Sequence, residues 1–209
     1  MLLDEPLANL DYKLREELRV EIPKIFEESG SIFVYATTEP EEALLLGGNT
    51  AALWEGQVRQ FDLTPTVYRR PTDAATARVF SDPPMNFLNV SKTGPKIMFG
   101  GGQSSIATGP MADLTDGRYI AGFRANHVEI TAQTAGSMLF DTKLVMTELT
   151  GSETFVHLDH GGEKWVGLIY GVHNLQLGIS LPVYIDQSHV YIFNENGDLV
   201  APASYALAA

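Results

Sequence analysis

Residues 2–11 read LLDEPLANLD, and this stretch decides how the first half of the chain is organised. An apolar run leads directly into Asp4 and Glu5, a proline follows, and Asp11 stands just before a segment with helical spacing of its apolar residues. The pattern predicts a short strand that ends in two carboxylates, and then a helix capped by Asp11. Adjacent carboxylates at the end of a strand are suited to holding a metal ion and polarising a water molecule, and such a pair normally acts on a phosphate.

The segments that follow alternate between helix and strand. Residues 11–29, DYKLREELRVEIPKIFEES, carry apolar residues at helical spacing, and Gly30 is expected to end this helix. Residues 31–37, SIFVYAT, are typical of a buried strand. Residues 38–46, TEPEEALLL, predict a second helix with Thr38 as its cap. Strands that alternate with helices predict an α/β layer with parallel pairing.

The elements predicted for residues 50–80 are shorter. Residues 50–61, TAALWEGQVRQF, read as a hairpin that turns at Glu55 and Gly56. Residues 63–71 and 73–80 read as two short helices.

Beyond Pro83 and Pro84 the pattern changes to short β-rich runs separated by glycine turns. The stretches DHGGEK (159–164) and NENGD (194–198) are strong hairpin signals. Several short strands at this spacing predict a barrel or sandwich of the oligosaccharide-binding (OB) kind. The sequence therefore predicts two domains, residues 1–84 and residues 85–209.

Net charge and composition exclude several classes of partner and site. The formal charge is −12: residues 1–84 carry 8 basic and 15 acidic side chains, and residues 85–209 carry 6 and 11. Neither half has the basic surface that nucleic acid or an anionic lipid surface requires, so we expect no nucleic-acid binding and no direct lipid binding. The chain has no cysteine, which excludes disulfides and thiolate metal sites.

Several motifs resemble those of one family. LLDEPLANLD resembles the Walker B motif and D-loop of ATP-binding-cassette (ABC) ATPases, and FVYATTEPEEAL (33–44) resembles their switch strand and loop. Further segments resemble the importer subfamily with a C-terminal regulatory (TOBE-type) β-domain, which includes the ATPases of maltose, glycerol-3-phosphate and related sugar or polyol importers. These segments are GQVRQFDLTPTVYRRP (56–71), SDPPMNFLNV (81–90), GFRANHVEI (122–130), ELTGSETFVHLD (148–159) and VYIFNENGD (190–198).

The resemblance covers nearly the whole chain and implies its fold class. Residues 1–84 would be the α/β C-terminal part of an ABC ATPase domain, with Walker B, D-loop and switch. Residues 85–209 would be an all-β, OB-like barrel domain of the TOBE/MOP type.

The resemblance also implies roles for four residues. Asp4 would support Mg²⁺, directly or through water, and Glu5 would polarise the attacking water. Asp11 would lie at the seam between two ATPase subunits and couple their nucleotide sites. Thr38 stands where the family places a histidine that contacts the γ-phosphate. The alternative interpretation of Asp4 and Glu5 is that they end a strand and help to cap the next helix.

Two family motifs do not occur in the sequence. The phosphate-binding loop G-x-x-x-x-G-K-[S/T] and the LSGGQ-type signature are both missing, and the glycine cluster FGGGQSS (99–105) lacks the lysine and reads as a flexible hairpin. Both motifs would lie upstream of Met1, so we expect a C-terminal piece of a longer ATPase that neither binds nor turns over ATP usefully alone. ATP and Mg²⁺ would be cofactors of the longer parent, with neither bound tightly by this piece.

The switch departs from the family pattern T-H-D-Q-x-E-A. The sequence has Thr37-Thr38-Glu39-Pro40-Glu41-Glu42-Ala43, so threonine replaces the histidine. A threonine offers one hydroxyl hydrogen bond and no titratable imidazole. One interpretation is that the complete site hydrolyses ATP slowly, or works as the weaker member of a heterodimeric pair. The other is that Glu5 supplies most of the catalysis and Thr38 is tolerated.

The resemblance implies partners and a location for the parent protein. It would form a homodimer or heterodimer with another ATPase subunit, dock on integral membrane permease subunits, and be cytoplasmic and peripheral on the inner face of the cell membrane. Incomplete strand pairing in residues 1–84 also favours a dimer or larger. Two other functions stay open: a non-catalytic regulatory module that binds a small molecule or oxyanion, and a degenerate pseudo-ATPase, favoured by Thr38 and Pro40.

Some conspicuous side chains are expected to be structural. His157 and His160 would face opposite sides of a strand, so a shared metal ion is not expected. Arg124, in the FRANHVE segment (123–129), is expected to be a salt-bridge anchor. Core packing is expected for most of the aromatic residues, which include Trp54 and Trp165.

Overall fold

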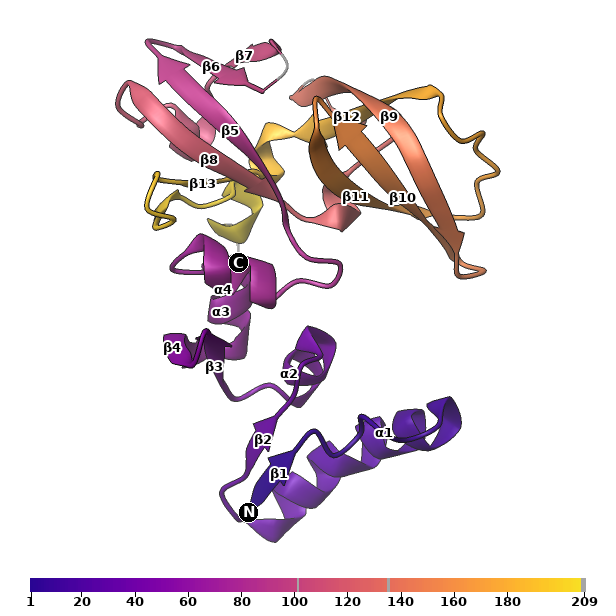
Figure 1. Cartoon of the computed structure of the whole chain (residues 1–209). Coiled ribbons are helices and arrows are strands. Elements are labelled where there is room, and N and C mark those ends of the chain that lie inside the picture. Colours follow the sequence, from indigo (N-terminus) through magenta and orange to yellow (C-terminus); the bar gives the residue numbers. More distant parts are fainter. Residues whose placement is uncertain (101, 135, 208–209) are drawn as a thin grey trace.

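The computed structural model describes residues 1–100, 102–134 and 136–207 (Figure 1). Its first part alternates strand and helix as predicted. Strand β1 (Leu2–Asp4) pairs in parallel with β2 (Val34–Ala36), and the helices are α1 (Tyr12–Ser29) and α2 (Pro40–Leu46). The two strands are joined through α1, which is the connection that a parallel pair requires.

The ends of α1 follow the predicted capping, whereas the start of α2 does not. The Asp11 side chain accepts a hydrogen bond from the Leu14 N–H at 3.0 Å, and Gly30 ends the helix with φ of 60°. The prediction that Thr38 caps α2 is wrong. Glu39 occupies the cap position and makes no side-chain bond to the helix, Pro40 follows in the first turn, and the Thr37 hydroxyl accepts a bond from the Glu39 N–H.

A hairpin and two short helices follow. The strands β3 (Asn49–Trp54) and β4 (Gln57–Leu63) are antiparallel, and both Glu55 and Gly56 have positive φ in the predicted turn. The helices are α3 (Thr64–Arg69) and α4 (Ala74–Val79). Trp54 lies beside the turn and is 39% exposed, so the core packing expected for most aromatic residues does not extend to it.

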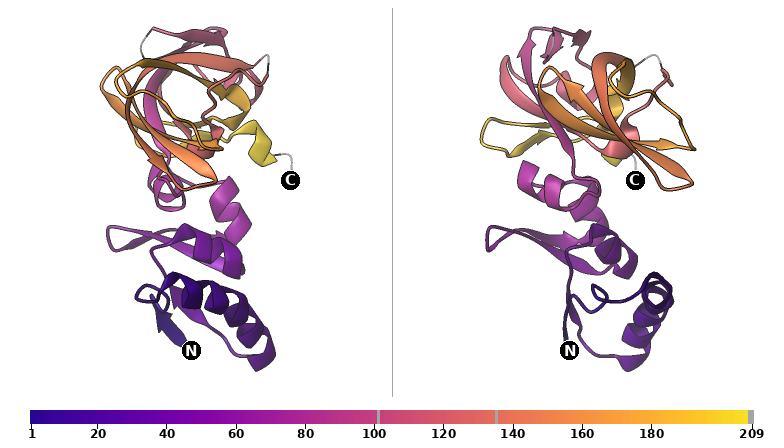
Figure 2. Two further views of the ribbon diagram at one scale, coloured as in Figure 1. Left: turned by 90° about the vertical axis from the view of Figure 1, so that its right-hand side faces the viewer. Right: turned by 45° about the vertical axis from the view of Figure 1, so that its right-hand side comes forward.

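The second part is all-β, and its described strands form two antiparallel sheets (Figure 2). The six-stranded sheet has the order β14-β13-β8-β5-β6-β7, and the four-stranded sheet has the order β11-β10-β9-β12. The predicted fold class, an α/β part followed by an all-β barrel-like part, is therefore confirmed. The strands are β5 (Asn86–Thr93), β6 (Lys96–Phe99), β7 (Ser104–Ile106), β8 (Gly117–Phe123), β9 (Ser137–Leu149), β10 (Glu153–His160), β11 (Glu163–Tyr170), β12 (Ser180–Asp186), β13 (Tyr191–Phe193) and β14 (Leu199–Ala201).

The three hairpins predicted in this part are present. DHGGEK joins β10 to β11, NENGD joins β13 to β14, and FGGGQSS lies between the paired strands β6 and β7. Gly101 of the last stretch lies outside the described residues. Three short 3-10 helices connect other strands in this part, η1 (Gly109–Met111), η2 (Ala125–His127) and η3 (Gln187–His189), and η4 (Ser204–Leu207) follows β14.

One hydrophobic core fills the space between the two sheets. Trp165 is 1% exposed, and its ring packs edge-on against Phe123 and Phe140. His160 is buried beside it and bonds to the main-chain carbonyls of Asp141 and Gly100, whereas His157 pairs with Glu148 at 2.6 Å. The two histidines thus hold separate structural positions, and no cluster of metal-ligating side chains occurs among the described residues.

Helices α3 and α4 contact both the β3–β4 hairpin and the all-β part (Figures 1 and 2). Arg124, which is 3% exposed, donates to the carbonyls of Tyr68 and Phe80 and to the Ser81 hydroxyl, and its guanidinium lies 3.8 Å from the centre of the Tyr68 ring. The predicted salt bridge is wrong, because no carboxylate among the described residues pairs with Arg124. It is instead an anchor for main-chain carbonyls, which a planar guanidinium suits.

Candidate functional site

The carboxyl ends of β1 and β2 bring three of the four predicted site residues to one edge. Asp4 lies opposite Ala36 in the parallel register, and the Glu5 N–H donates to the Ala36 carbonyl at 2.9 Å. Thr37 and Thr38 leave β2 at the same point. Parallel strands end at a common edge of a sheet, and in open α/β folds ligands bind beyond this edge.

The backbone turns sharply at Glu5. Its φ is +41°, in the left-handed region that residues other than glycine rarely adopt. Such a conformation costs on the order of 1 kcal/mol and occurs in tight turns and at functional sites. The turn comes directly after the strand end, at the residue that follows Asp4.

The side chains at this edge have few partners. Asp4, Glu5 and Thr38 are exposed, and none of the three makes a side-chain hydrogen bond or ion pair with another described residue. Thr37 differs from Thr38, because its hydroxyl donates to Glu42 at 2.6 Å and is thus used within the protein. The arrangement leaves two carboxylates and one hydroxyl available to a ligand.

Two arginines of α1 hold the residue that follows Thr38. Arg15 and Arg19 approach the two oxygens of the Glu39 carboxylate at 3.1 and 2.9 Å, and Arg19 also pairs with Glu16 at 2.9 Å. These contacts tie the helix after the D-loop-like stretch to the switch segment. Sequence analysis missed this network, although arginines four residues apart lie on one face of a helix and Glu39 adjoins a predicted site residue.

A buried carboxylate supports the same segment from the other side. Glu42 is 4% exposed and accepts hydrogen bonds from Thr37 and, at 3.0 Å, from the Tyr35 hydroxyl. Burial, followed by the hydrogen bond to Glu42 and its charge, raises the pKa of Tyr35 well above its usual value. Tyr35 therefore stays a neutral donor, and the turn between β2 and α2 is fixed on both sides.

Asp11 is not joined to the other three predicted residues. Its carboxylate caps α1, and among the described residues no hydrogen bond or ion pair links it to Asp4, Glu5 or Thr38. Its proposed coupling role is thus additional to a capping role that the structure does show.

The donor set is compatible with magnesium. Mg²⁺ is commonly held through one or two carboxylates, with water and substrate phosphates completing its octahedron. Asp4 offers one exposed carboxylate without an ion-pair partner among the described residues, and Glu5 stands next to it. This is a fit for a phosphate-associated ion rather than for a site built from protein ligands alone.

Comparisons with known proteins agree with the family resemblance. The chain is 30% identical over 94% of its length to the xylose/arabinose import ATP-binding protein XacK of Haloferax volcanii. It is 29% identical over 92% of its length to the sn-glycerol-3-phosphate import ATP-binding protein UgpC of Cupriavidus pinatubonensis, and 28% identical over 93% to the trehalose/maltose import ATP-binding protein MalK of Thermococcus litoralis. The resemblance to ATP-binding subunits of sugar and glycerol-3-phosphate importers is confirmed.

These matches cover most of this chain but only about half of each relative. The chain spans about half the length of the curated relatives it matches, 53% of XacK and 55% of UgpC and MalK. No protein-family model matches the chain. Among solved structures, that of the molybdate-binding protein ModG aligns with 54% of this chain and 96% of its own, at 17% identity and a TM-score of 0.42. No helix in the described part of the chain is long and apolar enough to cross a membrane.

Proposed function

We propose that the chain is part of the ATP-hydrolysing subunit of an importer. Residues 1–84 would belong to the nucleotide-binding domain and residues 85–209 would form a regulatory β-domain. The observation that supports this best is the parallel pairing of β1 with β2, which puts Asp4 and Glu5 at the same edge as Thr38. The match to importer ATP-binding proteins over more than nine-tenths of the chain supports it independently.

The residues at this edge have separate roles in the proposal. When bound, ATP would supply the phosphoryl group and Mg²⁺ would neutralise its charge. Asp4 supports the metal ion, and Glu5 orients and polarises a water molecule, since phosphoryl transfer depends mostly on positioning. Thr38 offers one hydroxyl hydrogen bond where a histidine would offer a ring N–H. Asp11 lies at the seam with a second ATPase subunit.

The partners follow from the same proposal. The subunit pairs with itself or with a second ATPase and docks on permease subunits at the cytoplasmic face of the membrane, where it powers import of a sugar, a polyol or a glycerol-3-phosphate-like solute. Exposed apolar residues on the β1–β2 pair, Leu2 at 81% and Val34 at 56%, favour burial against another polypeptide surface. The 209 residues contain no phosphate-binding loop, so we expect no turnover of ATP by these residues alone.

The proposal is tested by measuring the steady-state rate of ATP hydrolysis by the subunit in the form in which the cell produces it. We expect Mg²⁺-dependent hydrolysis by the wild type and a several-fold higher rate for Thr38→His, because the imidazole restores a better-placed donor. Equal rates for the two proteins would count against a role for Thr38. Absence of hydrolysis in both would contradict the proposed function and favour a non-catalytic module.

A further inference from the structure

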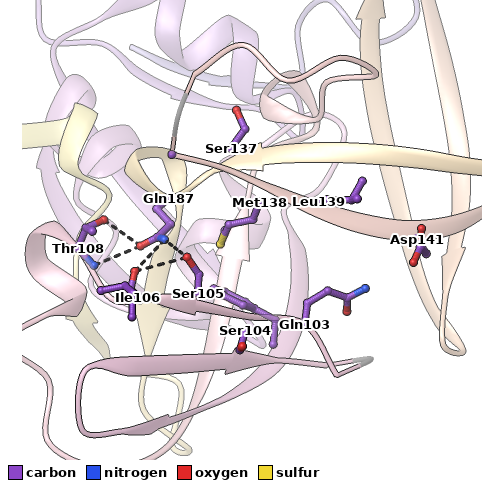
Figure 3. Close-up of a pocket in the computed structure, with 12 residues that line it drawn as sticks. Gln103, Ser104, Ser105, Ile106, Thr108, Ser137, Met138, Leu139, Asp141 and Gln187 are labelled. Atoms are coloured by element: carbon purple, nitrogen blue, oxygen red, sulfur yellow. Dashed lines mark hydrogen bonds between the residues drawn. The ribbon is translucent and has the colours of Figure 1, made fainter.

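A cavity in the described part of the chain lies in the all-β part, far along the chain from Asp4 and Glu5. It has a volume of about 640 Å³ and opens between the β6–β7 hairpin and the first half of β9 (Figure 3). Cavities of roughly 300–1,000 Å³ are typical of small-molecule sites. Nothing in the proposed ATPase chemistry uses this cavity.

One end of the cavity is preorganised by Gln187, which is 7% exposed. Its side-chain carbonyl accepts from the Thr108 hydroxyl at 2.9 Å, and its amide donates to the Ser105 hydroxyl at 2.6 Å and to the Ile106 carbonyl at 3.0 Å (Figure 3). These bonds fix β7 and the start of η3 relative to one another. A wall that is already ordered loses little further entropy when a ligand binds.

The middle of the cavity holds an amide without a partner. The side-chain Oε1 of Gln103 is buried, and no hydrogen bond to it occurs within the described residues. A buried acceptor that lacks a donor is costly to a folded protein. A ligand hydroxyl would satisfy it once the Gln103 side chain turns toward the cavity, whereas a fully deprotonated oxyanion such as sulfate or molybdate, which only accepts, would not.

The charge of the cavity lining also favours a neutral ligand over an anion. Asp141, opposite the Gln187 end in Figure 3, is the one charged side chain among the described residues of the lining, and it has no ion-pair partner there. Its carboxylate accepts hydrogen bonds and repels anions. Phe99 and Met138 add apolar surface for C–H groups. Among the lining residues that the structure describes there is no lysine or arginine to attract a phosphate or molybdate.

We propose that this cavity binds a neutral polyhydroxylated molecule, a polyol or a sugar, with Gln103 and Asp141 accepting from its hydroxyl groups. The proposal is independent of the ATPase function, because it rests only on residues of the all-β part. It assigns a ligand site to the part of the chain that sequence analysis left as a regulatory domain.

Isothermal titration calorimetry of the 209-residue chain tests the proposal. The probes are glycerol, xylitol, a pentose, a hexose and a disaccharide, with sulfate, phosphate and molybdate as the anionic set. We expect saturable binding of at least one neutral probe with a Kd of about 1 mM or tighter, and none of the anions. No binding of any neutral probe up to about 10 mM, or binding of an anion in its place, would overturn the proposal.

Two variants locate the binding. Gln103→Leu should weaken it at least tenfold while leaving the midpoint of thermal unfolding unchanged or higher, because the amide has no partner to lose. Gln57→Leu, an exposed position in β4, should bind as the wild type does. Equal binding by wild type and Gln103→Leu would place the ligand elsewhere and refute the assignment, and a lower unfolding midpoint would show that Gln103 has a structural partner.

Discussion

At the scale of single residues, a pair of histidines makes the stability of the folded protein depend on pH. His127 and His189 stack with ring centroids 3.9 Å apart, and Tyr205 packs against both. Burial, then the neighbouring His189 and the charge of Arg124, lower the pKa of His127 to about 3. Burial also lowers the pKa of His189, although Asp186 and Glu129 oppose this. Both rings are therefore neutral in the folded protein near neutral pH.

The low pKa of His127 should make the folded protein less stable as the pH falls. Between pH 6.5 and about 3 the unfolded chain binds a proton at His127 that the folded protein does not, so the free energy of unfolding falls as pH falls. The slope from this one group approaches about 1.4 kcal/mol per pH unit. Urea unfolding between pH 7 and pH 4 should show a steeper loss for the wild type than for His127→Gln. Identical slopes would refute the assignment.

The ion pairs of Glu39 lead to a second prediction about stability. Glu39→Gln removes the carboxylate shared by Arg15 and Arg19, and because these side chains are partly exposed, the loss should be only about 1 kcal/mol of unfolding free energy. Glu41→Gln is the matched control, since it removes an exposed carboxylate from the first turn of α2. Chemical denaturation measures both. Equal effects of the two substitutions would mean that the arginine pairs contribute nothing.

At the scale of elements, Arg124 joins α3 and α4 to the all-β part. Arg124→Lys keeps the charge but cannot reach the Tyr68 and Phe80 carbonyls and the Ser81 hydroxyl together, so buried acceptors lose their donor. We expect a loss of about 2 to 3 kcal/mol in unfolding free energy. Arg118→Lys, an exposed position in β8, should change it by less than about 0.5 kcal/mol. Equal stability of the two variants would show that Arg124 is not an anchor.

The elements themselves were largely predictable from local patterns. Apolar periodicity, the Asp11 cap and the glycine turns are local signals, and they predicted α1, the parallel strands and the hairpins correctly. The cap of α2 was predicted one residue too early, because threonine is a favoured cap residue and glutamate is not, and only the fold places Glu39 there. The Arg124 contacts and the cavity depend on residues far apart in sequence, which spacing along the chain does not reveal.

At the scale of the whole molecule, the candidate site was predicted in part. The shared edge of Asp4, Glu5 and Thr38 follows from parallel pairing, which the alternation of helix and strand predicts. The network of Arg15, Arg19 and Glu39 does not follow, because it depends on how α1 packs beside α2. Relatives matched over about half of their own length support the family resemblance, and the roles of the site residues stay proposals.

The most direct test of the central claim is the steady-state ATPase rate of the subunit, as the cell makes it, with and without Glu5→Gln. We propose that the Glu5 carboxylate polarises the attacking water, so removing it should lower the rate at least a hundredfold while Mg-ATP still binds, because general-base catalysis contributes on the order of 10² or more. Glu28→Gln, in the exposed last turn of α1, should hydrolyse ATP as the wild type does. A Glu5→Gln rate equal to that of Glu28→Gln would contradict the account.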